Sequence, residues 1–527
     1  MTDRYLSDRI RNRLRVTWNV FFRKWGKLTD VQINTIPFVI KKKNAIIISS
    51  TASGKTEAVL APLCELLREE RWDPISILYI TPTRALVNDI YERICEALLS
   101  IAIKTEKKTG DSPYLNWKKP PDILITTPES LDSMICRHPH ELNSVRAVVI
   151  DELHILDGNY RGDQLRVLLK RLEKIVPNFQ IYGLSATISD PHAVAARYIP
   201  DCNVVQVGGS RQIIPSCAAS LVNVFEMIRK ENLKKILIFC NSRRKTEEVA
   251  LQAKQLWGRN IVVVHHGSLH RNEREESEKV MKTQSRAVCV ATMTLEIGID
   301  IGSIDAVVLA EIPHTVSSFI QRIGRAGRRS GVIRIFCVSD PEEWDLYNIM
   351  ITAARDNLLD HKEYKPDISV GIQQIFSLLF AHPTGIKIAE LRSLLTDLCS
   401  STDLEEYILP HLSQLEWIEL YDNKAFATEK LMNLGQKGKI HSNIPDTRAF
   451  SVKNSITHKL IGEVELPETV KKQTAFVLSG KVWEIVKVEK RTIYVKPSPG
   501  KGVPASFKRI YDYGAFYYLL PEIFQNN

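Results

Sequence analysis

Residues 45–56 read AIIISSTASGKT, in which an apolar run passes through a short polar loop into an amphipathic segment. The run predicts a buried strand, and the loop before Lys55 and Thr56 predicts a turn at the N-terminus of a helix. Such a turn aims unpaired backbone N–H groups at an anion, while Lys55 can reach terminal phosphates and Thr56 can bind Mg²⁺. We therefore predict a triphosphate-binding loop; the alternative is an ordinary surface turn.

This loop matches the pattern G-x-x-x-x-G-K-[ST] imperfectly. Ser49 stands where the first glycine is expected, and Ala52 occupies a second position that is often glycine. Neither residue removes a donor, a metal ligand or a charge, so we expect the loop to keep its phosphate-binding function.

The composition is that of a folded protein with several domains. With 527 residues, of which 44% are hydrophobic and 25% charged, the chain has material for about three or four domains. No apolar stretch reaches the roughly 18 residues that span a bilayer, and the charged beginning lacks the apolar core of a signal peptide. We expect an intracellular, cytoplasmic protein that makes no membrane contact.

The net charge and the spacing of the cysteines favour some classes of function and argue against others. The net charge of +10 and the pI near 9.0 favour a polyanionic partner, because Lys and Arg neutralise phosphates. The nine cysteines are scattered without a Cys-x-x-Cys pair, which argues against a zinc or iron–sulfur module and against a disulfide framework. Buried thiols are the expectation.

From about residue 45 to 340, short β-branched runs alternate with amphipathic segments. The predicted strands are 75–80, 123–126, 147–150, 181–184, 236–239, 261–264, 287–290, 306–309 and 333–338. Continuous apolar strands between helices imply parallel sheets covered on both faces, with the chemistry at the carboxyl ends of the strands. The series is too long for one sheet, and a polar break near residues 200–211 divides it into comparable halves.

The chain changes character beyond about residue 365. Helical segments at 369–380, 387–398 and 403–415 precede a hairpin with an Asp422-Asn423 turn. This order is typical of a winged helix.

A third kind of pattern follows from about residue 447. Strands at 475–478, 481–488 and 492–495 predict a small β-barrel. An aromatic residue of either C-terminal module, Trp417 or Trp483, could stack on nucleic-acid bases; a core position is the alternative for both.

An acidic pair, Asp151-Glu152, follows the predicted strand 147–150. Phosphoryl transfer requires positioning and charge neutralisation, which a metal-holding Asp and a water-orienting Glu can supply beside a phosphate loop. The alternative is a solvated turn, but its place after an apolar strand favours the catalytic interpretation.

An arginine-rich segment, QRIGRAGRR at residues 321–329, ends the second half of the α/β region. Its guanidinium groups could reach a γ-phosphate and neutralise transition-state charge, as arginine fingers do. A basic tract that binds nucleic acid is the alternative, although it does not explain two Gly-Arg pairs three residues apart.

Eight segments occur in the order of the motifs of superfamily 2 helicases of the DEAD/DEAH type and closely resemble them. They are residues 49–56, 82–86 (PTRAL), 126–131 (TTPESL), 151–154 (DELH), 185–187 (SAT), 239–243 (FCNSR), 291–300 (ATMTLEIGID) and 321–328 (QRIGRAGR). Within that superfamily, TGD at 109–111, PPDILITTPESL at 120–131, HHGSL at 265–269 and LEIGIDIG at 295–302 look most like the Lhr (large helicase-related) family. Leu153 departs from the β-branched residue that such families often carry.

The resemblance implies an α/β fold of two tandem RecA-like parallel-sheet domains, followed by a winged helix and a small β-barrel domain. The expected boundaries are 1–30 for an N-terminal helical segment, 31–208 and 209–365 for the RecA-like domains, 366–440 for the winged helix and 441–527 for the barrel-like domain.

The resemblance also implies ATP and Mg²⁺ as cofactors. Asp151 would hold the metal, partly through water and together with Thr56, and Glu152 would be the catalytic base; Gln32 matches a glutamine that reads adenine. The residues implied to be catalytic are Lys55, Asp151, Glu152, Gln321, Arg325 and Arg328. Those implied to bind the nucleotide are Gln32, Ser53, Gly54, Lys55, Thr56, Gly298, Asp300, Arg325 and Arg328.

Other motif positions are implied to face the polynucleotide or to couple the two sites. Contacts of this kind go to backbone phosphates and are largely independent of base sequence. The residues implied to bind nucleic acid are Thr83, Arg84, Thr127, Pro128, Asn241, Ser242, Arg243 and Thr292. Ser185 and Thr187 match the segment that links nucleotide state to strand separation.

The function implied by the resemblance is ATP-dependent 3′-to-5′ movement on single-stranded DNA, with unwinding of DNA duplexes or RNA–DNA hybrids, in repair or defence. The partner would be single-stranded or forked nucleic acid, with DNA favoured and RNA or a hybrid as alternatives. One rival is a translocase or remodelling subunit of a repair or defence complex that leaves duplexes paired. Another is an inactive scaffold that binds nucleic acid through the winged helix alone.

Overall fold

The structure is a computed structural model. It describes residues 2–23, 26–51, 53–208, 212–296, 301–327, 331–356, 358–360, 364–445, 449–465, 475–489, 491–500, 502–505, 507 and 513–525. The chain divides into two compact units. Unit 1 contains residues 1–208, 361–446 and 511–527, and unit 2 contains residues 209–360 and 447–510.

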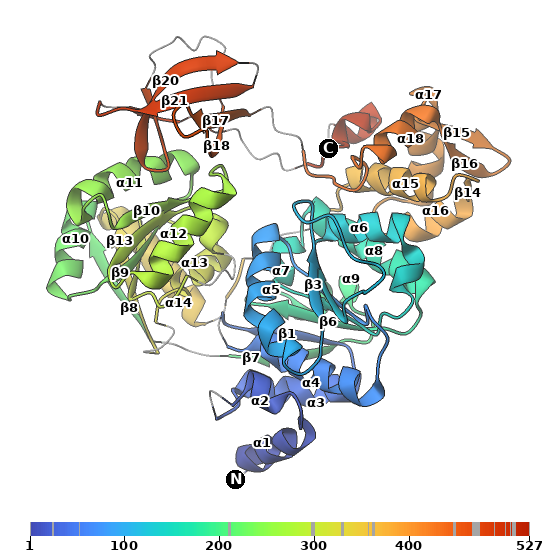
Figure 1. The fold of residues 1–527 in the computed structure, drawn as a ribbon, viewed down its shortest axis with the longest axis horizontal. Helices are drawn as coiled ribbons and strands as arrows, with labels where there is room; N and C mark the ends of the chain where they lie inside the picture. Colours follow the sequence, from blue (N-terminus) through green and yellow to red (C-terminus); the bar gives the residue numbers. More distant parts are fainter. Residues whose placement is uncertain are drawn as a thin grey trace. The chain divides into compact units, whose positions relative to one another are not determined.

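Unit 1 is built on a seven-stranded parallel sheet with the order β3-β4-β2-β5-β6-β1-β7 (Figure 1). The strands are β1 (Ala45–Ser49), β2 (Ile77–Ile80), β3 (Thr105–Lys108), β4 (Ile123–Thr126), β5 (Ala147–Ile150), β6 (Gln180–Ser185) and β7 (Asn203–Val207). Side chains alternate between two cores, because Ile46 and Ile48 pack on one face of the sheet and Ala45 and Ile47 on the other.

Helices cover both faces of this sheet. They are α1 (Thr2–Arg13), α2 (Trp18–Phe21), α3 (Asp30–Ile40), α4 (Lys55–Glu70), α5 (Arg84–Leu99), α6 (Pro128–Arg137), the 3₁₀ turn Pro139–Leu142, α7 (Leu153–Leu156), α8 (Tyr160–Ile175) and α9 (Pro191–Tyr198). Four of them begin at the carboxyl end of a sheet strand: α4 follows β1, α5 follows β2, α6 follows β4 and α7 follows β5. Their N-termini therefore gather at one edge of the sheet.

A small helical module completes unit 1. It contains α15 (Ser369–Ala381), β14 (Ile386–Lys387), α16 (Ile388–Leu395), a π-helix (Asp403–Ile408), α17 (Leu409–Gln414), β15 (Ile418–Tyr421), β16 (Lys424–Ala427) and α18 (Glu429–Gln436). Asp422 and Asn423 both have positive φ, as a two-residue hairpin turn of type I′ requires. The order helix, strand, two helices and hairpin agrees with the winged-helix interpretation. The last elements of the unit are a 3₁₀ turn (Tyr517–Leu519) and α19 (Glu522–Gln525).

A buried carboxylate fastens this module to the sheet domain. Asp132 on α6 is fully buried and accepts hydrogen bonds from the side chains of Gln373 and Gln374 on α15, at 3.0 and 2.6 Å. Ser377 of α15 also donates to it, and Arg171 of α8 lies 3.5 Å away. Because α15 packs on α6 and α8 as well (Figure 1), the module and the sheet domain form one packed body.

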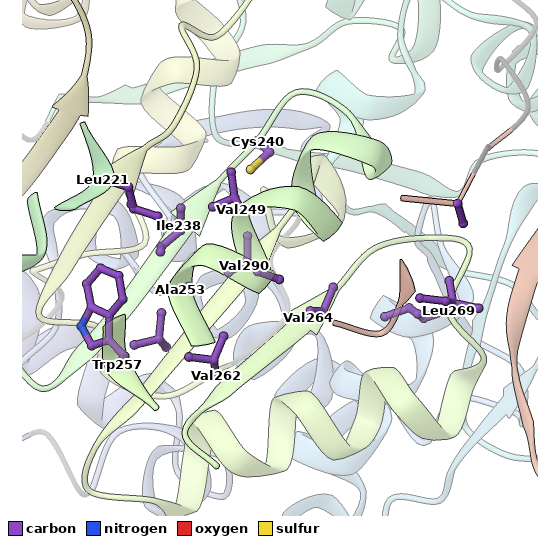
Figure 2. Close-up of a cluster of buried hydrophobic side chains, with 14 of the residues drawn as sticks. Leu221, Ile238, Cys240, Val249, Ala253, Trp257, Val262, Val264, Leu269 and Val290 are labelled. Carbon is purple, nitrogen blue, oxygen red and sulfur yellow. The ribbon is translucent and has the colours of Figure 1, made fainter. Parts of the chain in front are cut away.

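Unit 2 is built on a six-stranded parallel sheet with the order β10-β11-β9-β12-β13-β8. The strands are β8 (Gln212–Ala218), β9 (Lys235–Phe239), β10 (Val262–His265), β11 (Ala287–Ala291), β12 (Ala306–Leu309) and β13 (Val332–Val338). The helices are α10 (Leu221–Lys230), α11 (Arg243–Trp257), α12 (Arg271–Thr283), α13 (Val316–Ile323) and α14 (Pro341–Arg355), with a 3₁₀ turn at Met293–Leu295. Figure 2 shows Val249, Ala253 and Trp257 of α11 packed over Ile238 and Val290 of the sheet.

A curled mixed sheet packs on this core. Its order is β18-β17-β21-β20-β19-β22, with strands β17 (Phe450–Asn454), β18 (Leu460–Val464), β19 (Ala475–Leu478), β20 (Lys481–Glu489), β21 (Thr492–Pro497) and β22 (Val503–Pro504). Within the described residues no pairing joins β18 to β22, so the described ladder is an open, curled sheet. Its apolar residues continue the core of unit 2 through Leu269 (Figure 2).

A second buried carboxylate fastens the curled sheet to unit 2. Glu247 on α11 accepts hydrogen bonds from the backbone N–H groups of Ser479 and Gly480, each at 2.7 Å, and lies 2.9 Å from His266 Nε2. The hairpin turn between β19 and β20 is therefore held directly by a helix of the parallel-sheet domain.

The predicted fold class is confirmed, with differences at the edges. Strands β3, β7 and β8 were not predicted, and β7 lies inside the segment interpreted as a break between the halves. These are edge strands with polar residues, so they lack the continuous apolar run that marks the central strands. No helix in the described part of the chain is long and apolar enough to cross a membrane.

Trp483 has a core position, and Trp417 is partly buried against the core of the small helical module. Trp483 is 5% exposed and its indole N–H donates to the carbonyl of Leu478 at 2.9 Å, so the base-stacking hypothesis is wrong for this residue. Trp417 packs on Phe376 and carries the ammonium of Lys430 over its ring at 4.2 Å.

Candidate nucleotide and nucleic-acid sites

The loop predicted to bind phosphate connects β1 to α4, so the predicted order of strand, loop and helix is present. Lys55, in the first turn of α4, donates to the carbonyl oxygens of Ser49 at 2.5 Å and Ser50 at 3.0 Å, so its ammonium lies within the curve of the loop. Among the described residues, the buried hydroxyl of Ser53 has no hydrogen-bond partner. A buried unpaired hydroxyl beside an ammonium at a helix N-terminus fits a phosphate ligand.

Gln32 packs directly against this loop. Its side-chain oxygen accepts from the backbone N–H of Thr29 at 2.9 Å, and the Thr29 hydroxyl donates to the carbonyl of Ser53 at 2.9 Å. Gly54 has φ +90°, and a Cβ atom there would lie 2.3 Å from Gln32 Nε2. The positive φ favours glycine at position 54, a Cβ there would displace the amide end of Gln32, and the loop is braced by the start of α3.

Asp151 lies at the end of β5, opposite the start of α4. Tyr79 donates to Asp151 Oδ2 at 2.8 Å. Burial and the neighbouring Glu152 carboxylate raise the pKa of Asp151 from 3.8 to about 6. The carboxylate of Asp151 and the hydroxyl of Thr56 at the start of α4 are oxygen ligands of the type that Mg²⁺ prefers.

Glu152 adopts a strained backbone conformation, with φ +47° in the left-handed region. This turn places its carboxylate 3.6 Å from His154 Nδ1, which in turn lies 3.0 Å from the hydroxyl of Ser185. Ser185 donates to the carbonyl of Thr187 at 3.1 Å. His154, the last residue of the acidic motif, therefore contacts both Glu152 and Ser185 of the Ser-Ala-Thr segment.

Four of the predicted nucleic-acid contacts lie at the starts of α5 and α6. Thr83 and Thr127 are the N-cap residues of these helices, and Pro128 is the first residue of α6. Exposed Arg84 pairs with Asp111 at 2.5 Å, and a Cβ at Gly110 would lie 2.8 Å from its guanidinium. Two helix N-termini and an exposed arginine can accept phosphate groups.

The predicted contacts in unit 2 have a similar setting. Ser242 caps α11 by accepting from the N–H of Lys245, and Arg243 donates to the hydroxyl of Ser268 at 2.9 Å. Asn241 precedes this cap, and Thr292 follows β11 at the start of the 3₁₀ turn. These residues again lie at the carboxyl ends of parallel strands.

The arginine-rich segment is described only as far as residue 327. Gln321 and Arg325 are buried in unit 2, where a guanidinium N–H of Arg325 donates to the carbonyl of Glu296. Gly298, Asp300 and Arg328 lie outside the described residues. Because Arg325 is only 1% exposed, the role implied for it at a phosphate requires its guanidinium to become accessible.

Several side chains that organise these sites were not predicted. Arg322 pairs with the carboxylate of Glu296 at 2.6 Å and donates to Asn241 Oδ1 at 2.8 Å, which ties three motifs of unit 2 together. Tyr79 and Arg161 serve unit 1 in the same way. Tyr79 lies near the end of β2, and Arg161 follows the DELH motif by a few residues. These positions are the only features of the sequence that point to the two residues, because no regular spacing relates them to their partners.

Comparisons with known proteins agree with this geometry. The family model described as "DEAD/DEAH box helicase" matches residues 29–194, and the model described as "Helicase conserved C-terminal domain" matches residues 219–330. The chain therefore belongs to the DEAD/DEAH box helicases of superfamily 2, a class of ATP hydrolases that act on nucleic acid.

Within this class the chain is similar to proteins named ATP-dependent helicase Lhr-Core. It is 32% identical to that of Methanocaldococcus jannaschii over 90% of this chain and 62% of the relative. It is 30% identical to that of Methanothermobacter thermautotrophicus over 94% of this chain and 65% of the relative. The chain thus spans somewhat less than two thirds of the length of these relatives.

Solved structures of helicases share the fold. A DUF1998 helicase MrfA bound to DNA has a TM-score of 0.75 at 21% identity, covering 93% of this chain and 73% of that one. Helicase Lhr of Mycobacterium smegmatis, bound to single-stranded DNA and AMP-PNP, has a TM-score of 0.68 at 23% identity, covering 87% of this chain and 64% of that one.

Proposed function

We propose that this chain uses ATP hydrolysis to move 3′-to-5′ along single-stranded DNA and to unwind DNA duplexes or RNA–DNA hybrids. One observation carries the proposal: the predicted phosphate loop, the acidic pair and the N-termini of α5 and α6 share the carboxyl edge of one parallel sheet. The relatives named ATP-dependent helicases, and the similar structures bound to DNA, support it.

The residues of unit 1 fit the chemistry of ATP hydrolysis. The ammonium of Lys55 would give up its hydrogen bonds to the carbonyls of Ser49 and Ser50 and would bind the terminal phosphates instead. The Ser53 hydroxyl would donate to a phosphate oxygen. Glu152 would orient the attacking water and accept its proton, with His154 beside its carboxylate. Mg²⁺ bound by Thr56 and Asp151 would neutralise phosphate charge.

Unit 2 would act on the same nucleotide through Gln321, Arg325, Arg328, Gly298 and Asp300, the roles that the resemblance implies. Arginine at this step neutralises the charge that develops on the transferred phosphoryl group. The two motor domains of this proposal are residues 31–208 and 209–365, and the later boundaries at 366–440 and 441–527 belong to the same proposal.

Backbone-binding residues on both units would convert the ATP cycle into movement. Thr83, Arg84, Thr127 and Pro128 in unit 1, and Asn241, Ser242, Arg243 and Thr292 in unit 2, would hold phosphates of one strand. Ser185 and Thr187 would report the state of Glu152 to the rest of unit 1 through His154. An intracellular location, with a role in repair or defence, goes with this activity.

The test is ATPase activity measured side by side with single-stranded DNA, single-stranded RNA and RNA–DNA forks. We expect stimulation by single-stranded DNA that is lost in Lys55→Ala and Glu152→Gln. Lys174→Ala removes a lysine from an exposed surface pair and serves as the matched control. Absence of stimulation by any polynucleotide would contradict the proposal and would favour a scaffold.

A fluorescent fork assay separates the helicase from its rival. Strand release that requires ATP supports unwinding. ATPase stimulated by DNA without strand release would instead identify a translocase or a remodelling subunit of a larger complex.

A further inference from the structure

Arg161, in the first turn of α8, joins two loops that are distant in sequence. Its guanidinium pairs with both carboxylate oxygens of Glu129, through Nε at 2.6 Å and Nη2 at 3.1 Å. The remaining Nη1 donates to the backbone carbonyl of Pro82. Pro82 immediately precedes Thr83 and Arg84, and Glu129 immediately follows Pro128, so each contact falls beside a predicted phosphate-binding residue.

The same arginine is connected to the acidic motif by a short and rigid path. Only α7 and a turn separate Glu152 from Arg161. Asn159 caps α8 by accepting from the N–H of Arg161 at 2.9 Å, and its amide donates to the carbonyl of Ile155 in α7 at 2.7 Å. A Cβ at Gly162 would lie 2.1 Å from the carbonyl oxygen of Leu156, so α7 and α8 approach as closely as their backbones allow.

We propose that Arg161 is a positioning residue, which fixes the phosphate-binding loops at Pro82 and Glu129 relative to each other and links both to the acidic motif. The proposal rests on the nucleic-acid contacts proposed above. Arginine suits this task because its planar fork can serve a carboxylate with two N–H groups and a carbonyl with a third. A lysine offers one ammonium in place of this fork.

The packing around Glu129 makes the contact hard to replace. The carboxylate is largely enclosed, and burial opposes its ionisation, but the charge and hydrogen bonds of Arg161 lower the pKa of Glu129 below its usual value. Removing Arg161 leaves an enclosed carboxylate without this cation and leaves the Pro82 carbonyl without this donor. Both loops then lose their common anchor.

The experiment compares Arg161→Ala and Arg161→Lys with Arg197→Ala. Arg197 makes a similar two-contact pair with Asp157, at 3.0 and 2.6 Å, but touches neither loop, so it controls for the loss of a partly buried arginine pair. The readouts are the single-stranded DNA concentration that half-saturates ATPase, the maximal DNA-stimulated rate, and the affinity for a fluorescent ATP analogue without DNA.

We expect Arg161→Ala to raise the half-saturating DNA concentration about tenfold or more. A tenfold change in affinity corresponds to about 1.4 kcal/mol of binding free energy. Nucleotide affinity should change far less, and Arg197→Ala should match the parent protein in all readouts. Arg161→Lys should fall between the two, and it keeps the proposal testable if the alanine variant does not fold.

Equal effects of Arg161→Lys and Arg197→Ala on DNA half-saturation would overturn the positioning role. So would an Arg161→Lys effect confined to nucleotide affinity. If the parent protein shows no DNA-stimulated ATPase, the proposed function itself fails, which is a result distinct from failure of this inference.

Discussion

At the scale of single residues, the phosphate loop depends on contacts that restrict substitution. Gly54 has a positive φ, and the side chain of Gln32 lies directly against it. The same side chain accepts a hydrogen bond from the backbone N–H of Thr29. Gln32 therefore braces the loop as well as occupying the position implied to read adenine. Substitutions at either residue should disturb the loop even before nucleotide binds.

Gly54→Ala should abolish tight nucleotide binding. The new methyl group collides with Gln32 and the positive φ adds strain, together costing roughly 1–3 kcal/mol of unfolding free energy. Titration with a fluorescent ATP analogue and thermal unfolding measure both effects. Gly26→Ala is the matched control, because Gly26 also has positive φ (+66°) but has nothing within 4 Å of its Cβ position. Equal nucleotide affinities of the two variants would contradict the prediction.

Asp151→Asn should stabilise the protein in the absence of nucleotide at neutral pH. A carboxyl pKa raised from 3.8 to about 6 favours folding below about pH 4, and this contribution is lost as the pH rises through about 6. Asparagine has no such titration, so the variant should gain roughly 1–3 kcal/mol near neutral pH, with the gain shrinking toward about pH 4.

Urea unfolding of the parent protein and Asp151→Asn across this range measures the difference. The variant should hydrolyse no ATP at any of these pH values. A pH-independent stability difference, or a variant less stable than the parent throughout, would show that burial of this carboxylate is not costly.

The ease of predicting a site residue depended on how its role is encoded. Lys55, Thr56 and Asp151 follow apolar strands at fixed spacing, so the sequence alone placed them near one edge of a sheet. Tyr79 and Arg161 act on partners 72 and 79 residues away in the chain, and no local pattern marks such pairs. The buried position of Arg325 likewise depends on tertiary packing.

At the scale of elements, single carboxylates inside helices hold the accessory modules. Asp132 on α6 receives hydrogen bonds from α15, and Glu247 on α11 receives them from the β19–β20 turn. Each carboxylate is fully buried and accepts at least two hydrogen bonds from its module. Docking of both modules is therefore directional as well as hydrophobic.

Asp132→Asn should loosen the module formed by α15–α18. Burial opposes ionisation of this group, but the hydrogen bond from His441 and the charge of Arg171 outweigh it and lower the pKa of Asp132 to about 2. An amide would turn N–H groups toward several donors, costing roughly 2–4 kcal/mol of unfolding free energy.

The stability that Asp132 provides is present above about pH 4 and is lost as the pH falls through about 2, so the full loss should appear at neutral pH. Urea unfolding measures it. The control is Asp397→Asn, which breaks the more exposed pair with Lys170 of α8. Similar losses in both variants would contradict a special role for Asp132.

Central elements were predicted from the sequence and peripheral ones were not. The apolar runs of β4, β5 and β12 were predicted with their observed bounds, because strands buried on both faces have few polar residues. The edge strand β3 reads Thr-Glu-Lys-Lys, and the paired helices of the small module include a π-helix that no simple period predicts. The curled sheet required long-range pairing of β17 with β21.

At the scale of the whole molecule, the net charge of +10 should make the affinity for nucleic acid depend on salt concentration. The logarithm of affinity for single-stranded DNA should fall linearly with the logarithm of salt concentration, by roughly 0.7 for each phosphate contacted. Arg84→Ala should reduce this slope by about one contact. Arg271→Ala, which removes an exposed arginine from a surface pair, should leave it unchanged. A flat dependence in the parent protein would contradict backbone tracking.

The path of the backbone has a consequence for synthesis of the protein. The chain leaves unit 1 after residue 208, returns at 361, leaves again after 446 and returns at 511. During synthesis, the first parallel sheet therefore emerges well before α15. Asp132 is made before Gln373 and Gln374, which donate hydrogen bonds to it in the folded protein. Nascent chains that stop near residue 360 would still hold Gln164 and Arg171 at Asp132 but would lack the three donors from α15, so this side of α6 and α8 should stay accessible until α15 is made.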